Sequence, residues 1–182
     1  MSASSRLPSR AELWPVYSIA LFLAASWALY RVFWYVPSWL EYLSLWSILT
    51  VIAYVLSFAL LEGALLAAPA VLLALVLPKR LFRQRFVAQG SAVTLALGGL
   101  AFLVQRRAAA IYDLELWQIL AYPLLALLLL ALLGLAAGAL FTRWPRLQAL
   151  VEVFAGRMTV FGWLYTLLGL FSWAVVILRN LM

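Results

Sequence analysis

The chain is a succession of long apolar runs separated by short segments that carry most of its charge. A helix of about 20 apolar residues spans the ~30 Å hydrocarbon core of a bilayer. Of the 182 residues, 68% are hydrophobic and 10% are charged, whereas an ordinary water-soluble domain is about 25% charged. Lipid also requires every backbone polar group to be satisfied within the chain, which favours helices. The sequence therefore predicts an all-α, polytopic transmembrane helical bundle, a single integral membrane domain over residues 1–182.

Five membrane spans are predicted from the apolar runs. Tryptophan and tyrosine residues gather at both ends of the first run, as they do where a helix meets the membrane–water interfaces. The second run contains Pro69, which is expected to kink its helix. The predicted spans cover residues 14–36, 52–77, 87–104, 119–141 and 160–178.

A helix at the membrane surface is predicted between the first two spans. Ser38 and Glu41 have the spacing of a capping box, which indicates a helix start after Pro37. The apolar run from there to Leu77 would be roughly 58 Å long as one straight helix, nearly twice the membrane. It is either two spans, or an interfacial helix over residues 38–50 that leads into one span, separately or as a single bent helix. Charge favours the interfacial helix, because it keeps the basic segments on one side.

A second interfacial helix is predicted over residues 145–157, between the last two spans. Its apolar side chains recur at helical spacing, opposite a polar face. That pattern is typical of a helix lying in the plane of the membrane surface.

The basic residues indicate the orientation of the bundle. The net charge is +7, with 13 basic against 6 acidic residues, and the positive charge lies in clusters between apolar runs instead of on one face. It therefore predicts contact with membrane lipids, and no nucleic-acid partner is expected. The positive-inside rule places the N-terminus inside and the C-terminus outside, in a multi-pass protein of the inner or plasma membrane. The segments predicted to be inside hold Arg6, Arg10, Lys79, Arg80, Arg83, Arg85, Arg143, Arg146 and Arg157, and those outside hold Arg106, Arg107 and Arg179.

The chain contains no cysteine and no histidine. This excludes disulfides, the usual zinc sites, haem held by His or Cys, and iron–sulfur clusters. It also removes the commonest general base at neutral pH. No cofactor, metal site or catalytic residue is therefore predicted, and the chain is more readily interpreted as a non-enzyme.

Two charged residues inside predicted spans are candidates for a site. Glu62 lies within the second span, where a carboxylate costs about 2.5–3.5 kcal/mol on insertion scales. Arg31 in the first span has a similar predicted depth, so the two are expected to form an intramembrane charge pair. The alternatives are a functional site, such as a proton or ion relay or an anchor for a lipid headgroup, and a snorkelling Arg31 beside a neutral Glu62.

Four charged residues between the third and fourth spans form a second candidate, on the outer face. Asp113 and Glu115 lie near Arg106 and Arg107 in the sequence. Together they could bind a divalent cation or a phosphate-bearing substrate, but two carboxylates without further ligands are a weak pattern for a metal. A solvated loop is the simpler interpretation.

Small residues at three- or four-residue spacing predict close contacts between helices. Such stripes allow helix backbones to approach one another in lipid. We expect them to serve packing within the bundle. The stripes are Gly90, Thr94 and Gly98, then Gly134 and Gly138, then Gly162, Thr166 and Gly169.

Three segments resemble the N-terminal five-helix membrane module of lipoteichoic-acid-synthase-like and sulfatase-like transferases. They are YRVFWYVP at the end of the first span, the following SWLEYLSLW, and the closing LRNLM. In that family the module precedes an extracellular alkaline-phosphatase-type domain, which these residues do not include, so no catalytic residue can be transferred. The resemblance implies a membrane module that partners an enzyme in trans.

Three functions are consistent with these features. The first is a non-catalytic membrane module that assembles with or anchors a membrane-protein partner, in a cell-envelope lipid or lipid-linked substrate pathway. The second is a small transporter or channel component that uses the Arg31–Glu62 pair. The third is an intramembrane lipid-modifying enzyme with its Arg/Asp/Glu site at the outer face.

Overall fold

A computed structural model describes residues 7–106 and 116–181 of the chain, and these residues are almost entirely helical, with no strand among them. A short 3-10 turn, Arg83–Arg85, precedes the third helix. The five α-helices are α1 (Arg10–Trp39), α2 (Leu45–Val76), α3 (Phe86–Arg106), α4 (Leu116–Arg143) and α5 (Pro145–Leu181). The predicted all-α class is confirmed.

Four helical segments are long and apolar enough to cross a membrane, which indicates a multi-pass membrane protein. They are α1, α2, the segment Arg83–Gln105 that contains most of α3, and α5. Within α4, the apolar stretch Leu128–Arg143 is shorter. A fifth span along α4 therefore stays a prediction.

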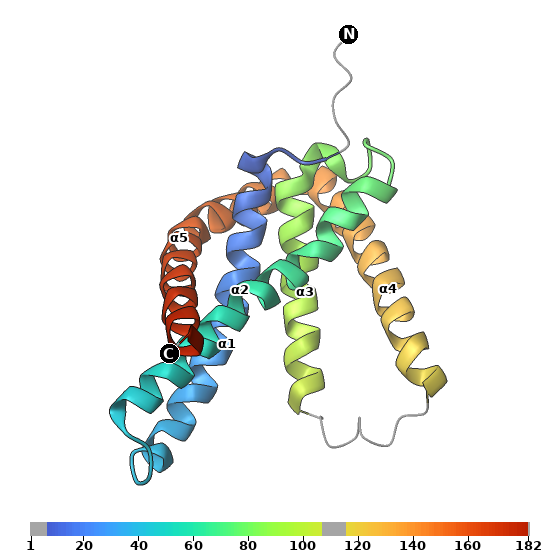
Figure 1. Ribbon diagram of the computed structural model, residues 1–182. Helices are drawn as coiled ribbons and strands as arrows, with labels where there is room; N and C mark the ends of the chain where they lie inside the picture. The colour runs from blue at the N-terminus through green and yellow to red at the C-terminus, as the bar shows by residue number, and fades with distance from the viewer. Residues whose placement is uncertain (1–6, 107–115, 182) are drawn as a thin grey trace.

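The helices alternate in direction, so the bundle has two distinct ends (Figure 1). α1 and α3 run one way, while α2 crosses the bundle obliquely in the opposite sense. α1 packs against α2, α3 and α5, whereas the main neighbour of α4 is α3. We call one end the basic end, because it holds the start of α1, the α2–α3 connection and the α4–α5 junction. The residues that define it are Arg10, Lys79, Arg80, Arg83, Arg85, Arg143 and Arg146.

The helix start predicted at Ser38 is wrong. α1 continues through Ser38 to Trp39, and the chain then turns before α2 begins. The cap of α2 is Ser44, whose Oγ accepts a hydrogen bond from the backbone N–H of Ser47 at 3.2 Å. A side-chain oxygen in this position satisfies one of the free N–H groups of the first helical turn. The predicted interfacial helix over residues 38–50 is therefore divided between the end of α1 and the start of α2.

The long apolar run after this turn is one helix. α2 contains 32 residues, including Pro69, which makes it about 48 Å long. A helix longer than the hydrocarbon core is accommodated by tilting, and α2 is the helix that runs obliquely across the bundle (Figure 1).

The predicted interfacial helix over residues 145–157 and the last predicted span are also continuous. Together they form α5, a single helix of 37 residues. Its first part extends along the basic end and the rest turns toward the opposite end (Figure 1). Pro145 occupies its first position, where the missing N–H costs no intrahelical hydrogen bond.

The best-buried apolar cluster lies near the basic end. The α2–α3 connection folds inward there, so that Phe82 and Phe86 are 0% and 1% exposed and pack with Val16 and Val93. Elsewhere, large apolar side chains face outward, such as Trp34, which is 74% exposed. An outer surface of this kind is suited to lipid and would be untenable in water.

The glycines of the predicted stripes lie at close contacts between elements, as expected. A Cβ atom added at any of them would meet another element's side chain at 3.3 Å or less. These contacts involve α1, α2, α3 and the α2–α3 connection, so the stripes serve packing within the bundle. The glycines are Gly90, Gly98, Gly134, Gly138, Gly162 and Gly169.

Candidate functional site

A large groove lies between α1, α2 and α3, with a volume of about 1060 Å³. Most of its lining is apolar or small, and one charged side chain, Glu62, contributes to it. The lining residues are Leu23, Ala24, Ser26, Trp27 and Tyr30 of α1; Glu62, Leu65 and Leu66 of α2; and Leu95, Leu97, Gly98, Gly99, Ala101, Phe102 and Gln105 of α3.

Two polar side chains mark one end of the groove. α1 and α3 run away from the basic end, so their last lining residues, Tyr30 and Gln105, are the farthest from it. We call these two residues the polar mouth. Glu62 lies deeper, because its neighbour Gly63 packs against Leu21 of α1, nine residues before Tyr30. Apart from Glu62 and Ser26, the deeper part of the groove, toward the basic end, is lined by leucines and small residues.

Aromatic rings form part of the wall beside the polar mouth. The Trp27 ring is stacked on Tyr30 with 5.7 Å between centroids, and it meets Phe102 edge-on at 5.0 Å. Both arrangements are favourable for aromatic pairs. The Trp27 Nε1–H is buried and has no hydrogen-bond partner among the described residues. The wall is therefore rigid and apolar, with one donor left unused.

The structure does not join Arg31 to Glu62. Both side chains are exposed, and the described residues contain no ion pair between them. Successive residues of an α-helix point about 100° apart, so Tyr30 lines the groove while Arg31 is not one of its lining residues. Gly63, the neighbour of Glu62, also lies against Leu21, ten residues before Arg31, so the two charged residues are offset along α1. A functional role for either residue stays a prediction.

The predicted outer-face site lies outside the described residues. Arg107, Asp113 and Glu115 belong to the segment 107–115, and nothing is described of the side chain of Arg106, the last residue of α3. Their grouping stays a prediction.

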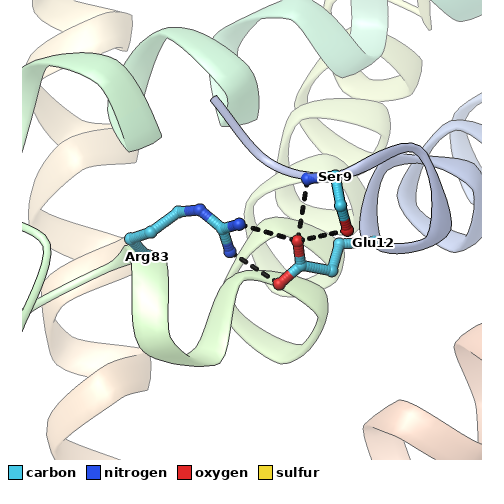
Figure 2. A network of polar contacts seen from close by, with 3 residues as sticks. All are labelled: Ser9, Glu12 and Arg83. Carbon is cyan, nitrogen blue, oxygen red and sulfur yellow. Dashed lines mark hydrogen bonds and ion pairs between the residues drawn. The ribbon is translucent and has the colours of Figure 1, made fainter. Parts of the chain in front are cut away.

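An ion pair that the sequence analysis missed joins α1 to the α2–α3 connection. The Arg83 guanidinium donates two hydrogen bonds to the Glu12 carboxylate, at 2.6 and 2.7 Å, and Ser9 donates two more from its backbone N–H and its Oγ (Figure 2). Glu12 lies ahead of the apolar run that begins at Trp14. The hydrogen bonds from Arg83, assisted by those from Ser9, lower the pKa of Glu12 to about 2. The pair is therefore charged at neutral pH and fixes the start of α1.

A buried amide connects α3 to α4 in a comparable way. The Gln89 Nε2 donates to the backbone oxygens of Leu81 at 2.9 Å and Gly134 at 3.0 Å. Nearby, Arg85 donates to the backbone oxygen of Gly138 at 3.2 Å. Both contacts require α4 to come close, which the glycines at 134 and 138 allow. These interactions are structural, and they hold the basic end together while the groove lies farther along the bundle.

Metal binding and similarity to other proteins add no further site. Within the described ranges, no group of three or more Asp and Glu side chains is close enough to hold a metal ion. No protein-family model, no curated protein and no solved structure matches the chain. The groove and its polar mouth are thus the features from which a function can be argued.

Proposed function

We propose that this protein is a non-catalytic, multi-pass membrane module that holds one amphipathic lipid in the groove between α1, α2 and α3. In this role it would present the lipid, or a lipid-linked substrate, to a partner protein in the membrane. The observation that carries the proposal is the polarity of the groove. Most of its lining is apolar, Tyr30 and Gln105 lie at one end, and Glu62 places one carboxyl group farther in.

The size and lining of the groove are suited to a lipid. Sites for small molecules usually enclose about 300–1000 Å³ and combine apolar walls with a few polar groups that fix orientation. The groove has about 1060 Å³ and this composition. An acyl or isoprenoid chain would lie along Leu66 and Leu95, and the polar head would lie between Glu62 and the mouth.

The orientation of the bundle determines which leaflet the mouth faces. We propose five spans, including α4, with the N-terminus inside, in the inner or plasma membrane. The gathering of basic side chains at one end of the bundle supports this orientation, because such residues are retained on the inner side. The polar mouth, at the opposite end of the groove, would then face the outer leaflet.

Single cysteines should report this orientation, and the chain has no native cysteine to remove. Glu41→Cys lies in the α1–α2 turn and Gln84→Cys lies in the α2–α3 connection; both positions are exposed and at opposite ends. A membrane-impermeant maleimide should label the first variant on intact cells, and the second only after the membrane is permeabilised. The reverse pattern would overturn the proposed orientation.

Blocking the groove should remove the bound lipid without disturbing the fold. Gly99 lines the groove, and a Cβ atom added there would meet no atom within 4 Å. Gly99→Trp should therefore fill the space that the lipid chain needs. In native mass spectrometry of the detergent-purified protein, the fraction carrying one lipid should fall about tenfold, because the indole and the chain exclude each other sterically.

Gly156→Trp is the matched control for this substitution. Gly156 also has nothing within 4 Å of an added Cβ, but it lies on α5 and outside the groove. This variant should keep its lipid and its melting temperature. Equal lipid retention by the wild type and by a folded Gly99→Trp variant would refute lipid binding in the groove.

The transporter and enzyme alternatives have no comparable support. Arg31 and Glu62 form no ion pair within the described residues. A transporter would also be expected to use several intramembrane polar groups and broken helices. For an enzyme, the residues predicted at the outer face lie outside the described ranges or have no described side chain.

A further inference from the structure

We infer that the groove selects a membrane lipid whose head carries a protonated primary amine, with Glu62 as the acceptor of that amine. The inference rests on the proposed function, since it assigns the head chemistry of the lipid that the groove holds. Its basis is the charge of the groove and the unpartnered carboxyl group of Glu62 that faces it.

Glu62 is the side chain in the groove that most needs a partner. It lies in the middle of α2, a helix apolar enough to span the membrane, where a carboxyl group is costly unless something pairs with it. Glu62 makes no hydrogen bond or ion pair with the described residues. Because it faces the groove, a ligand seated there would meet the carboxyl group directly.

The charge of the lining argues for a cationic head. Among the described residues that line the groove there is no arginine or lysine, whereas Glu62 is one of them. A head bearing only negative charge would therefore meet a like charge and no counter-charge. A cationic head would pair with the Glu62 carboxylate and remove the free-energy cost of an unpaired charge within the span.

Hydrogen-bonding capacity favours a primary over a quaternary amine. A primary ammonium group has three N–H donors, which the Glu62 carboxylate in the groove can accept. A quaternary ammonium has no N–H donor and is usually held in a cage of aromatic faces. Here the rings of Trp27, Tyr30 and Phe102 contact one another at 5.0–5.7 Å, so they form a closed wall.

Photoreactive lipids that differ only in their heads test this inference with the unmodified chain. Phosphatidylethanolamine, its N-acetyl derivative, phosphatidylcholine and phosphatidylglycerol, each with a diazirine in one acyl chain, are incorporated into nanodiscs with the purified protein. Trypsin cuts after Arg85 and Arg106, so the peptide 86–106 carries the α3 wall of the groove. Phosphatidylethanolamine should label this peptide at least fivefold more than the other three lipids. Free ethanolamine, which lacks a chain, should not compete at equal concentration.

Substitution of Glu62 should remove the preference and leave the binding of the chain. In Glu62→Gln, labelling by phosphatidylethanolamine should fall to that of the N-acetyl lipid, whose own labelling should not change. Glu152→Gln is the matched control, because Glu152 is an exposed carboxylate on α5 that accepts a hydrogen bond from Gln148 outside the groove. This variant should keep the wild-type preference.

The possible failures of this experiment are distinguishable. Equal labelling of the wild type by all four lipids would overturn the amine assignment while leaving lipid binding intact. Labelling by phosphatidylcholine that equals phosphatidylethanolamine would overturn the choice of a primary amine. If no lipid labels peptide 86–106 above Gly99→Trp, the proposed function itself fails. The comparison between phosphatidylethanolamine and its N-acetyl form needs no variant, so misfolding of Glu62→Gln would not weaken the test.

Discussion

Replacing Gly162 with leucine is expected to prevent α5 from packing on α1 and to destabilise the bundle by about 3 kcal/mol. A Cβ atom at this position would lie 3.2 Å from the Cα of Ser18, which is a backbone atom and cannot rotate away. Ser18 is itself fully buried and donates its Oγ hydrogen to the backbone oxygen of Trp14. The leucine side chain would force the two helices apart. Their association depends on close packing, because lipid provides no hydrophobic driving force between helices.

The effect of Gly162→Leu can be measured by unfolding the purified protein with SDS and following the fluorescence of its nine tryptophans. Gly156→Leu, on the same helix but with open space around the added Cβ, should change the stability by less than about 0.5 kcal/mol. If both variants unfolded at the same SDS fraction as the wild type, the α1–α5 contact would not be as close as described.

The positions of close packing could be predicted from the sequence, but their partners could not. In lipid, small residues repeated every three or four positions have few roles other than allowing a neighbour to approach, so the stripe Gly162, Thr166 and Gly169 indicated a contact face. Nothing in that spacing shows that Gly162 meets α1 while Gly169 meets Leu60 of α2. The partners depend on how the helices are rotated and tilted.

The wrong prediction of a helix start at Ser38 shows that two nearby serines can both be candidates for the cap of one helix. Ser38 with Glu41 matched the capping-box spacing, whereas Ser44 has no acidic residue three positions on. The structure uses Ser44, because the helix of α1 extends past Pro37 and incorporates Ser38. A capping box was present in the sequence at Ser9 and Glu12, where it is formed and where Arg83 completes it. The basic cluster at residues 79–85 was predicted on the same side of the membrane as the N-terminus. That prediction could have indicated the Glu12–Arg83 pair.

The candidate site was only partly predictable for a related reason. Glu62 was identified because a carboxyl group within an apolar run is unusual, and that argument needs only the sequence. Its surroundings require three helices to be rotated so that Tyr30, Glu62 and Gln105 line one groove. Periodicity along the chain gives the faces of each helix but not which of them meet, so the groove became visible only in three dimensions.

Replacing Gln89 with leucine is expected to loosen α4 from α3 and to destabilise the bundle by about 2 kcal/mol. Gln89 is 1% exposed, and its Nε2 donates to two backbone oxygens, one in the α2–α3 connection and one in α4. Leucine fills a similar space but donates nothing, so Leu81 and Gly134 would each lose a donor in a buried site. The change can be measured by SDS unfolding or as a lower melting temperature in detergent.

Two further substitutions separate hydrogen bonding from packing at Gln89. Gln89→Glu keeps the shape of the side chain but replaces the donating amide with an acceptor that would face two carbonyl oxygens, so it should destabilise the bundle at least as much as leucine does. Gln148→Leu removes a partly exposed amide that donates to Glu152 at 2.8 Å, and it should cost less than about 0.5 kcal/mol. A Gln89→Glu variant as stable as the wild type would mean that the shape of the side chain, and not its two hydrogen bonds, holds α4 in place. α4 would then be attached to the bundle mainly through the close approach of its glycines to Phe82 and Gln89.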